Sequence, residues 1–266
     1  MNSRLLLTLL LSHWAFFVIL LNFVPFDLLK AYGINETEEN NTNINFEKLV
    51  SQYLNWWANV PFEEDPQQVD KPCVIHDTGS FIFLHDPFEM GNIKNTCTIP
   101  QKSLFFPFYI GWCDNGNIGF YGIDAYDKLL ECALDANRGV VTMTAYLDDK
   151  NIIDVMIDNT DVHNLKVLHN NSLNNYYQEI GPTNFFTLTV TNKTQYTNYE
   201  KPQDFESSPT KYKAVAYCFC GFIDKDKLSP GNHQLNYNTK ITGSGGLDAT
   251  KGWDHESKIT YVFSVE

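Results

Sequence analysis

Short runs of apolar and aromatic residues, separated by turn residues, make up most of the chain. Eight runs stand out, at 81–84, 104–110, 140–147, 153–157, 185–191, 213–223, 233–239 and 258–265. In the last of them apolar and polar residues alternate from Ile259 to Val265, which is the period of a strand with one buried face. Turn residues lie between the runs, for example at 77–79 and 229–231. The pattern predicts an all-β fold, mainly an antiparallel β-sandwich that is jelly-roll-like, as a single domain over residues 46–266.

Two segments carry the period of a helix instead. Apolar residues over 46–60 recur at the spacing of an amphipathic helix, and one of Trp56 and Trp57 should lie on its buried face. A second helix is predicted at 126–136, with Asp124 as its N-cap. Both helices are expected at the periphery of the sandwich.

The first apolar run forms an expected N-terminal leader helix and has no charged residue from Leu5 to Phe26. Its length and the small residues at 31–33 are typical of a secretory signal peptide, residues 1–33, that is cleaved near its end. The run is also long enough to remain as a membrane-spanning signal anchor. In both cases the rest of the chain is expected outside the cytoplasm, because the weakly positive end stays inside. The polar segment 34–45 is interpreted as a solvated linker.

Four N-x-[ST] triplets are candidate N-glycosylation sites, at Asn35, Asn40, Asn170 and Asn192. Outside the cytoplasm such triplets are acceptable acceptors on surface loops. The pair in the linker is the preferred one.

Charge limits the class of partner. The chain has 19 Lys and Arg residues against 32 Asp and Glu residues, a formal net charge of −13. A nucleic-acid-binding surface needs clustered cations, and so does adhesion to anionic lipid, so neither is expected. Contact with a membrane is expected only through the N-terminal segment, if that segment is not cleaved.

Six cysteines, an even number, indicate disulfides in a protein that matures outside the cytoplasm. We favour the local pairs Cys73–Cys97 and Cys113–Cys132. Each bond would close a loop of about twenty residues, which stabilises by about 3 kcal/mol if the effect is the lost entropy of the unfolded chain.

Cys218 and Cys220 are two positions apart in a predicted strand. Regular strand geometry puts their Cα atoms about 6.5–7 Å apart, at the outer limit of disulfide reach. We therefore favour two buried thiols that act as small apolar side chains, with a redox pair as the alternative.

Several short motifs follow one another in a fixed order. They are Trp56-Trp57 with Pro61, Cys73, Phe83-Leu84, Cys97-Thr98-Ile99-Pro100, Phe105-Phe106-Pro107 and Leu228-Ser229-Pro230-Gly231-Asn232-His233. In this order the chain resembles a family of secreted bacterial and archaeal proteins of unknown function, over roughly residues 53 to 265. It departs from the family at Asp148-Asp149, where an acidic residue and a glycine are usual, and at 85–87, where small residues are usual. The resemblance implies a fold and a location, and no catalytic residues.

Catalytic motifs are scarce. The chain has no G-x-S-x-G, no H-E-x-x-H and no P-loop. Residues that could meet in a cupin-like metal site are His76, His85, His233, His255, Asp77, Asp86 and Asp254. A histidine in a loop is more often only hydrogen-bonded, so we predict no metal and no cofactor.

Two polar stretches are interpreted as turns and not as binding or catalytic sites. Residues 114–117, Asp-Asn-Gly-Asn, offer oxygen ligands without the spacing of an EF-hand, and a hairpin turn is favoured over weak calcium binding. Glu63, Glu64 and Asp65 are adjacent, whereas a glycosidase needs two carboxylates that face each other, so a solvated turn is favoured.

Aromatic residues are the remaining candidates for a ligand-binding site. Trp56, Trp57, Tyr109, Trp112 and Trp253 could present flat rings to a sugar. Trp112 and Trp253 are the candidates for stacking on a ligand, because they lie beside glycines in predicted turns.

These observations favour a non-catalytic binding or cell-envelope module outside the cytoplasm, whose ligand is a glycan or another envelope component. The alternative is a secreted hydrolase or sugar-active enzyme with a cupin-like site of histidine and aspartate. A weaker third hypothesis is a metal- or redox-handling protein centred on Cys218 and Cys220.

Overall fold

The structure is a computed structural model, and it describes most of the chain beyond the linker. The described residues are 44–64, 74–85, 91–116, 124–136, 138–161, 163–191, 194, 196, 209–244 and 253–266. The predicted signal peptide or anchor and nearly all of the linker therefore lie outside them. Among the described helices, none is long and apolar enough to cross a membrane.

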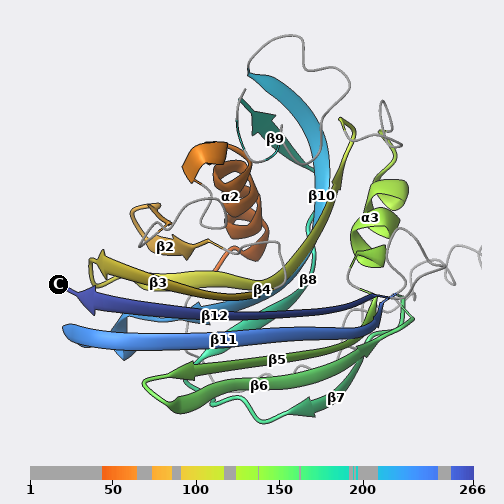
Figure 1. Cartoon of the computed structure of the whole chain (residues 1–266). Coiled ribbons are helices and arrows are strands. Elements are labelled where there is room, and N and C mark those ends of the chain that lie inside the picture. Colours follow the sequence, from red (N-terminus) through yellow and green to blue (C-terminus); the bar gives the residue numbers. More distant parts are fainter. Residues whose placement is uncertain are drawn as a thin grey trace, which may run out of the picture. The chain divides into compact units, whose positions relative to one another are not determined.

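The described strands form two six-stranded sheets (Figure 1). The first sheet has the order β1 (Ile75–Asp77), β2 (Phe81–Leu84), β4 (Ser103–Asp114), β10 (Thr210–Ile223), β8 (Tyr177–Pro182), and β9 (Phe186–Val190) also pairs with β10. The second has the order β3 (Gly91–Ile99), β12 (Trp253–Val265), β11 (Gly231–Ser244), β5 (Gly139–Leu147), β6 (Lys150–Asn159), β7 (Lys166–Asn170). Within the described sheets only β2–β4 and β3–β12 are parallel pairs. The predicted all-β, mainly antiparallel sandwich is thus confirmed.

A buried core joins the inner faces of the two sheets. Phe106 and Phe219 of the first sheet lie in the same apolar cluster as Tyr237 and Phe263 of the second. A buried hydrogen bond also crosses the interface, from the Thr239 hydroxyl to the carbonyl of Phe108, at 2.7 Å. Because both partners of this bond are buried, it specifies how the sheets align as well as contributing to stability.

The helix α2 (Phe46–Ala58) covers the outer face of the first sheet (Figure 1). Asn45 caps its N-terminus by accepting a hydrogen bond from the Lys48 amide, at 2.9 Å. Its buried face, which includes Tyr53 and Trp57, packs in a second apolar cluster with Phe105 and other side chains of the sheet. The first sheet is therefore buried on both faces, and this explains why 214–223 is a continuous apolar run rather than an alternating one.

The second helix, α3 (Tyr126–Asp135), differs from the prediction at its start. Its N-cap is Ala125, which makes no side-chain cap hydrogen bond. The expected cap, Asp124, instead forms an ion pair with Lys213 at 3.2 Å and accepts a hydrogen bond from Asn115. These partners on β10 and at the end of β4 offer the carboxylate a cation and an amide, so tertiary contacts replace the local cap.

Cysteines bind α3 and β4 together. Cys113 of β4 and Cys132 of α3 are joined by a disulfide, with Cα atoms 5.9 Å apart. Cys97 is also disulfide-bonded, and Cys73, its predicted partner, lies outside the described residues. The local pairing favoured from the sequence is thus the one present between β4 and α3.

The expectation of two buried free thiols at Cys218 and Cys220 is wrong. The two residues form a disulfide, and their Cα atoms lie 5.6 Å apart rather than at the spacing of a regular strand. The pairing of β10 with β4 shifts between Phe219 and Cys220, so that Cys220 lies opposite Pro107. The extra residue at this shift is Phe108 of β4, and β10 pairs with β8 without a shift. The observed Cα spacing of the two cysteines lies within the usual range for a disulfide, so the regular-strand value overestimated their separation.

Candidate functional site

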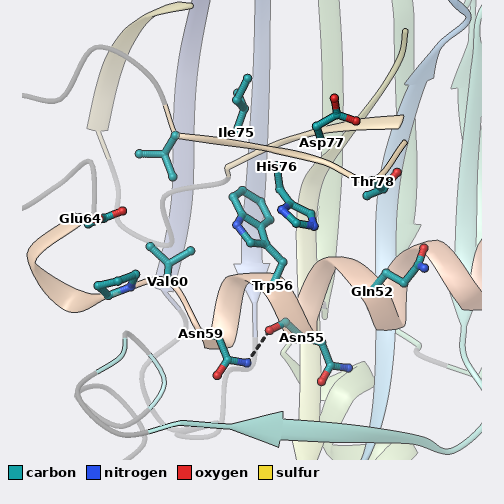
Figure 2. A pocket seen from close by; sticks show the side chains of 12 residues that line it. Gln52, Asn55, Trp56, Asn59, Val60, Glu64, Ile75, His76, Asp77 and Thr78 are labelled. Carbon is teal, nitrogen blue, oxygen red and sulfur yellow. Dashed lines mark hydrogen bonds between the residues drawn. The ribbon is translucent and has the colours of Figure 1, made fainter. Parts of the chain in front are cut away.

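A pocket of about 690 Å³ lies between α2, the short helix η2 (Phe62–Glu64) and strand β1 (Figure 2). Its lining residues are Gln52, Asn55, Trp56, Asn59, Val60, Pro61, Glu64, Val74, Ile75, His76, Asp77 and Thr78. The helix contributes amide side chains and one indole, and the strand contributes an imidazole, a carboxylate and a hydroxyl. The pocket therefore combines a flat aromatic surface with many polar groups.

The indole of Trp56 is the centre of the pocket, and the β1–β2 hairpin places aromatic rings around it. His76 lies opposite Phe83 across the hairpin, so both side chains face α2. The His76 ring lies nearly parallel to the Trp56 ring, with centroids 5.6 Å apart and planes at 15° (Figure 2). His85 meets Trp56 edge to face, at 5.8 Å and 88°. Trp56 itself is half-buried, so the cluster leaves part of its ring exposed to a ligand.

The wall formed by the hairpin is anchored at both ends. The carbonyl of buried His85 accepts a hydrogen bond from the Tyr261 hydroxyl of the second sheet, at 2.8 Å. At the turn, Asp77 accepts hydrogen bonds from the Gly79 amide at 2.7 Å and from the Lys102 ammonium at 2.6 and 2.7 Å. The hydrogen bonds from Lys102 and then from Gly79 lower the pKa of Asp77, so its exposed carboxylate remains ionised.

The opposite wall, α2, is held on the sheet by two asparagines that bind the edge of β9. The Asn55 amide nitrogen donates to the Thr187 carbonyl at 2.9 Å, and its oxygen accepts from the Thr189 amide at 2.8 Å. Asn59 repeats the pattern one step along, donating to the Thr189 carbonyl at 2.7 Å and accepting from the Thr191 amide at 2.9 Å. Each side chain thus pairs with the strand as a neighbouring backbone amide would.

The spacing of the two elements makes this match possible. Four residues of an α-helix rise by about 6 Å and two residues of a strand by about 6.7 Å. Asparagines at i and i+4 therefore meet every second residue along the strand edge. Because these amides are engaged with β9, Asn55 and Asn59 position the helix, and Gln52, Trp56 and His76 remain to face a ligand.

The electrostatic character of the pocket is acidic. Glu64 and Asp77 are the charged side chains among its described lining residues, which include neither a lysine nor an arginine. Among the described residues, no group of three or more His, Cys, Asp or Glu side chains is arranged to hold a metal ion. The arrangement suits an uncharged, polar ligand that has one flat apolar face.

The two tryptophans predicted to stack on a ligand do not line this pocket. Trp112 lies within β4 rather than in a turn, is partly buried, and packs against buried Trp57 with ring centroids 5.0 Å apart. The side chain of Trp253 lies outside the described residues. Trp56 was among the candidate aromatic residues, but Trp112 and Trp253 were preferred because they lie beside glycines in predicted turns. The strand β1, which completes the pocket around Trp56, was not predicted.

The histidines of the expected cupin-like site do not converge in the described part of the chain. His76 and His85 both contact Trp56, whereas His233 lies on β11 of the second sheet. Asp254 accepts a hydrogen bond from the Gly243 amide. Asp86 and the side chain of His255 lie outside the described residues.

His233 has a structural environment of its own. One ring nitrogen lies 2.7 Å from the Asp148 carboxylate and the other lies 2.7 Å from the Ser229 carbonyl. Both partners are acceptors, so both hydrogen bonds form only when the ring carries two protons. Burial alone would lower the pKa of His233, but the hydrogen bonds to Ser229 and Asp148 outweigh it and raise the pKa.

The two polar stretches are engaged in local structure where they are described. Asn115 extends the pairing of β4 with β10 through hydrogen bonds with Lys213, and buried Asp114 accepts from the Gly116 amide and the Tyr196 hydroxyl. Asn117 and Asp65 lie outside the described residues. Glu63 and Glu64 are exposed side chains of η2, and of the two only Glu64 lines the pocket.

No protein-family model matches the chain, and searches of curated proteins and of solved structures find no match either. Function is therefore inferred from the residues of the pocket and from their geometry.

Proposed function

We propose that this protein is a non-catalytic binding module outside the cytoplasm, and that its ligand is an uncharged glycan held in the pocket between α2 and β1. The observation that carries the proposal is the half-buried Trp56 ring, which forms an aromatic surface with His76 inside a polar cavity. A pyranose has the complementary chemistry, because one of its faces is apolar while its rim carries hydroxyl groups.

Charge favours a neutral sugar over an acidic one. The carboxylates of Glu64 and Asp77 lie at the pocket, its described lining residues include no lysine or arginine, and the whole chain carries a formal charge of −13. The Asp77 carboxylate is paired with Lys102, and the repulsion of an anionic glycan comes from the strongly negative charge of the chain as a whole, which costs affinity. Uronic-acid or sulfated sugars should therefore bind more weakly than neutral ones of the same size.

Two observations support the location. The uncharged leader from Leu5 to Phe26 favours export, and the disulfides Cys113–Cys132 and Cys218–Cys220 are the kind that persist in oxidising compartments. The net charge of −13 also favours a ligand that is neither nucleic acid nor anionic lipid.

The test is a binding screen with soluble neutral oligosaccharides and their uronic-acid counterparts, followed by titration calorimetry of any that bind. Trp56→Ala should weaken binding at least tenfold, which corresponds to about 1.4 kcal/mol, and Trp56→Phe should recover part of it. His76→Ala gives a second variant at an exposed side chain, in case the loss of Trp56 packing lowers stability. Tyr146→Ala is the matched control, because Tyr146 is an exposed aromatic residue on the second sheet.

Two results would contradict the proposal. One is that none of the neutral oligosaccharides binds. The other is that Trp56→Ala and Tyr146→Ala affect binding equally, which would place the ligand elsewhere on the protein.

A further inference from the structure

Strand β7 is the exposed edge of the second sheet. In the described residues it pairs only with β6, and it ends the strand order. Val167 and Leu168 on this strand are 53% and 55% exposed, the highest values among the large apolar side chains described. An edge strand with exposed apolar residues is a surface on which other chains pair, so soluble proteins normally protect it.

The last residue of this strand is Asn170, the acceptor of an Asn-Asn-Ser triplet. Its side chain is exposed, and its Oδ1 accepts a hydrogen bond from the Ser172 amide at 3.1 Å. The turn engages Oδ1, and within the described residues Nδ2 makes no hydrogen bond. The hydroxyl of Ser172 accepts a hydrogen bond from the Asp154 amide at 3.2 Å, which holds the triplet against β6.

We propose that Asn170 is N-glycosylated and that the glycan covers the apolar edge formed by Val167 and Leu168. The proposal rests on the extracytoplasmic location argued above. The carbohydrate donor would be a lipid-diphosphate-linked oligosaccharide, the class of donor that N-x-[ST] acceptors require. A bond forms between C1 of the first sugar and Nδ2 of Asn170, the C1–O bond to the lipid diphosphate breaks, and one amide proton passes to a base of the transferase.

The sequence favoured the linker pair at Asn35 and Asn40, and the place of Asn170 in the fold is what singles out this triplet instead. A glycan begins two residues from Leu168 on the same strand, so its volume stands beside the unpaired edge. The hydrated sugar blocks the approach of a second strand without altering the residues that pair with β6. The other three triplets, at Asn35, Asn40 and Asn192, lie outside the described residues.

The experiment expresses the full chain with its own leader in a eukaryotic secretory host and maps the peptides before and after N-glycosidase treatment. Wild type should carry a glycan at Asn170, and Asn170→Gln should lose that mass. Asn171→Gln is the matched control, because it removes the neighbouring asparagine and keeps the triplet. Ser172→Thr should also remain modified, since threonine keeps both the triplet and the hydroxyl.

The second measurement is the oligomeric state by light scattering. Asn170→Gln should lose monomer in favour of larger species as concentration rises, and adding Leu168→Lys to that variant should restore the monomer. An unmodified Asn170 in secreted protein whose Cys113–Cys132 bond has formed would overturn the modification site while leaving the location intact. Retention in the cytosol with reduced cysteines would overturn both. A monomeric Asn170→Gln variant would overturn the role of the glycan as a cover.

Discussion

Substitution of Asn59 tests how the pocket is built, because this residue joins α2 to the edge of β9. Asn59→Ala removes hydrogen bonds from Nδ2 to the Asn55 and Thr189 carbonyls, and to Oδ1 from the amide and hydroxyl of Thr191. The backbone amide of Asn59, which caps α2 by donating to Trp56, is unchanged by the substitution. The variant therefore isolates the contact between the helix and the strand.

The expected loss follows from the partners that remain. The Thr189 carbonyl and the Thr191 amide are backbone groups at a partly buried edge, and each loses its partner on α2. At about 1 kcal/mol net for each bond, with a further contribution from the bond to Asn55, the free energy of unfolding should fall by about 2–3 kcal/mol. Asn55→Ala should have a similar effect, because Asn55 makes the equivalent pair of bonds to Thr187 and Thr189.

The assay combines urea denaturation with native-state amide exchange. Asn59→Ala should accelerate exchange at Thr191, whereas Asn55→Ala should accelerate it at Thr189, since each variant frees a different amide. Gln52→Ala is the control: Gln52 is an exposed residue of the same helix and lines the same pocket. Its effect should stay within about 0.5 kcal/mol.

Two results would refute this reasoning. If both asparagine variants unfold within about 0.5 kcal/mol of wild type, the side chains do not hold the helix on the strand. If Thr189 and Thr191 exchange equally fast in the two variants, the specific pairing of amides with the β9 edge is incorrect.

Two further predictions concern the second sheet and the core. The pKa of His233 is raised above 6.5, so its hydrogen bonds to Asp148 and Ser229 stabilise the fold fully below that value and are lost as pH rises through the raised pKa. Urea midpoints of wild type should fall across that window relative to those of Asp148→Asn, and parallel pH profiles would contradict the assignment. Gly221→Ala should destabilise by about 1–3 kcal/mol, because an added Cβ would lie 2.6 Å from the Phe106 ring. A thermal melt unchanged from wild type would show that the ring moves aside without cost.

Local patterns predicted the elements that have one or two apolar faces. The eight apolar runs all lie in strands, and the helical spacing at 46–60 and 126–136 marks α2 and α3 to within about two residues. The missed strands are β1, β3, β7 and β8. Strand β1 is only three residues long, β3 is mostly polar, and β8 contains a glycine and a proline. Such strands form because a neighbour offers hydrogen bonds, which their own sequence does not reveal.

The candidate site was hard to predict for the same reason. Trp56 occupies a position that helical spacing alone assigns to the margin of the buried face. Its role depends on His76 and His85, which the β1–β2 hairpin brings into contact with it. It also depends on Asn55 and Asn59, which need β9 as a partner. None of these contacts is marked by a regular spacing of residues in the sequence.

The sequence by itself determined the all-β class, the two helices and the even number of cysteines, because each depends on composition or on spacing between near neighbours. Tertiary structure alone decided that Cys218 and Cys220 pair, that Asp124 leaves the cap of α3, and that Trp56 rather than Trp112 faces a cavity. These outcomes depend on the actual spacing of residues along β10, on an ion pair and on packing between elements far apart in the chain. Such long-range contacts form only when the two sheets pack against each other. For that reason the site can be recognised in the folded structure and not in the sequence pattern.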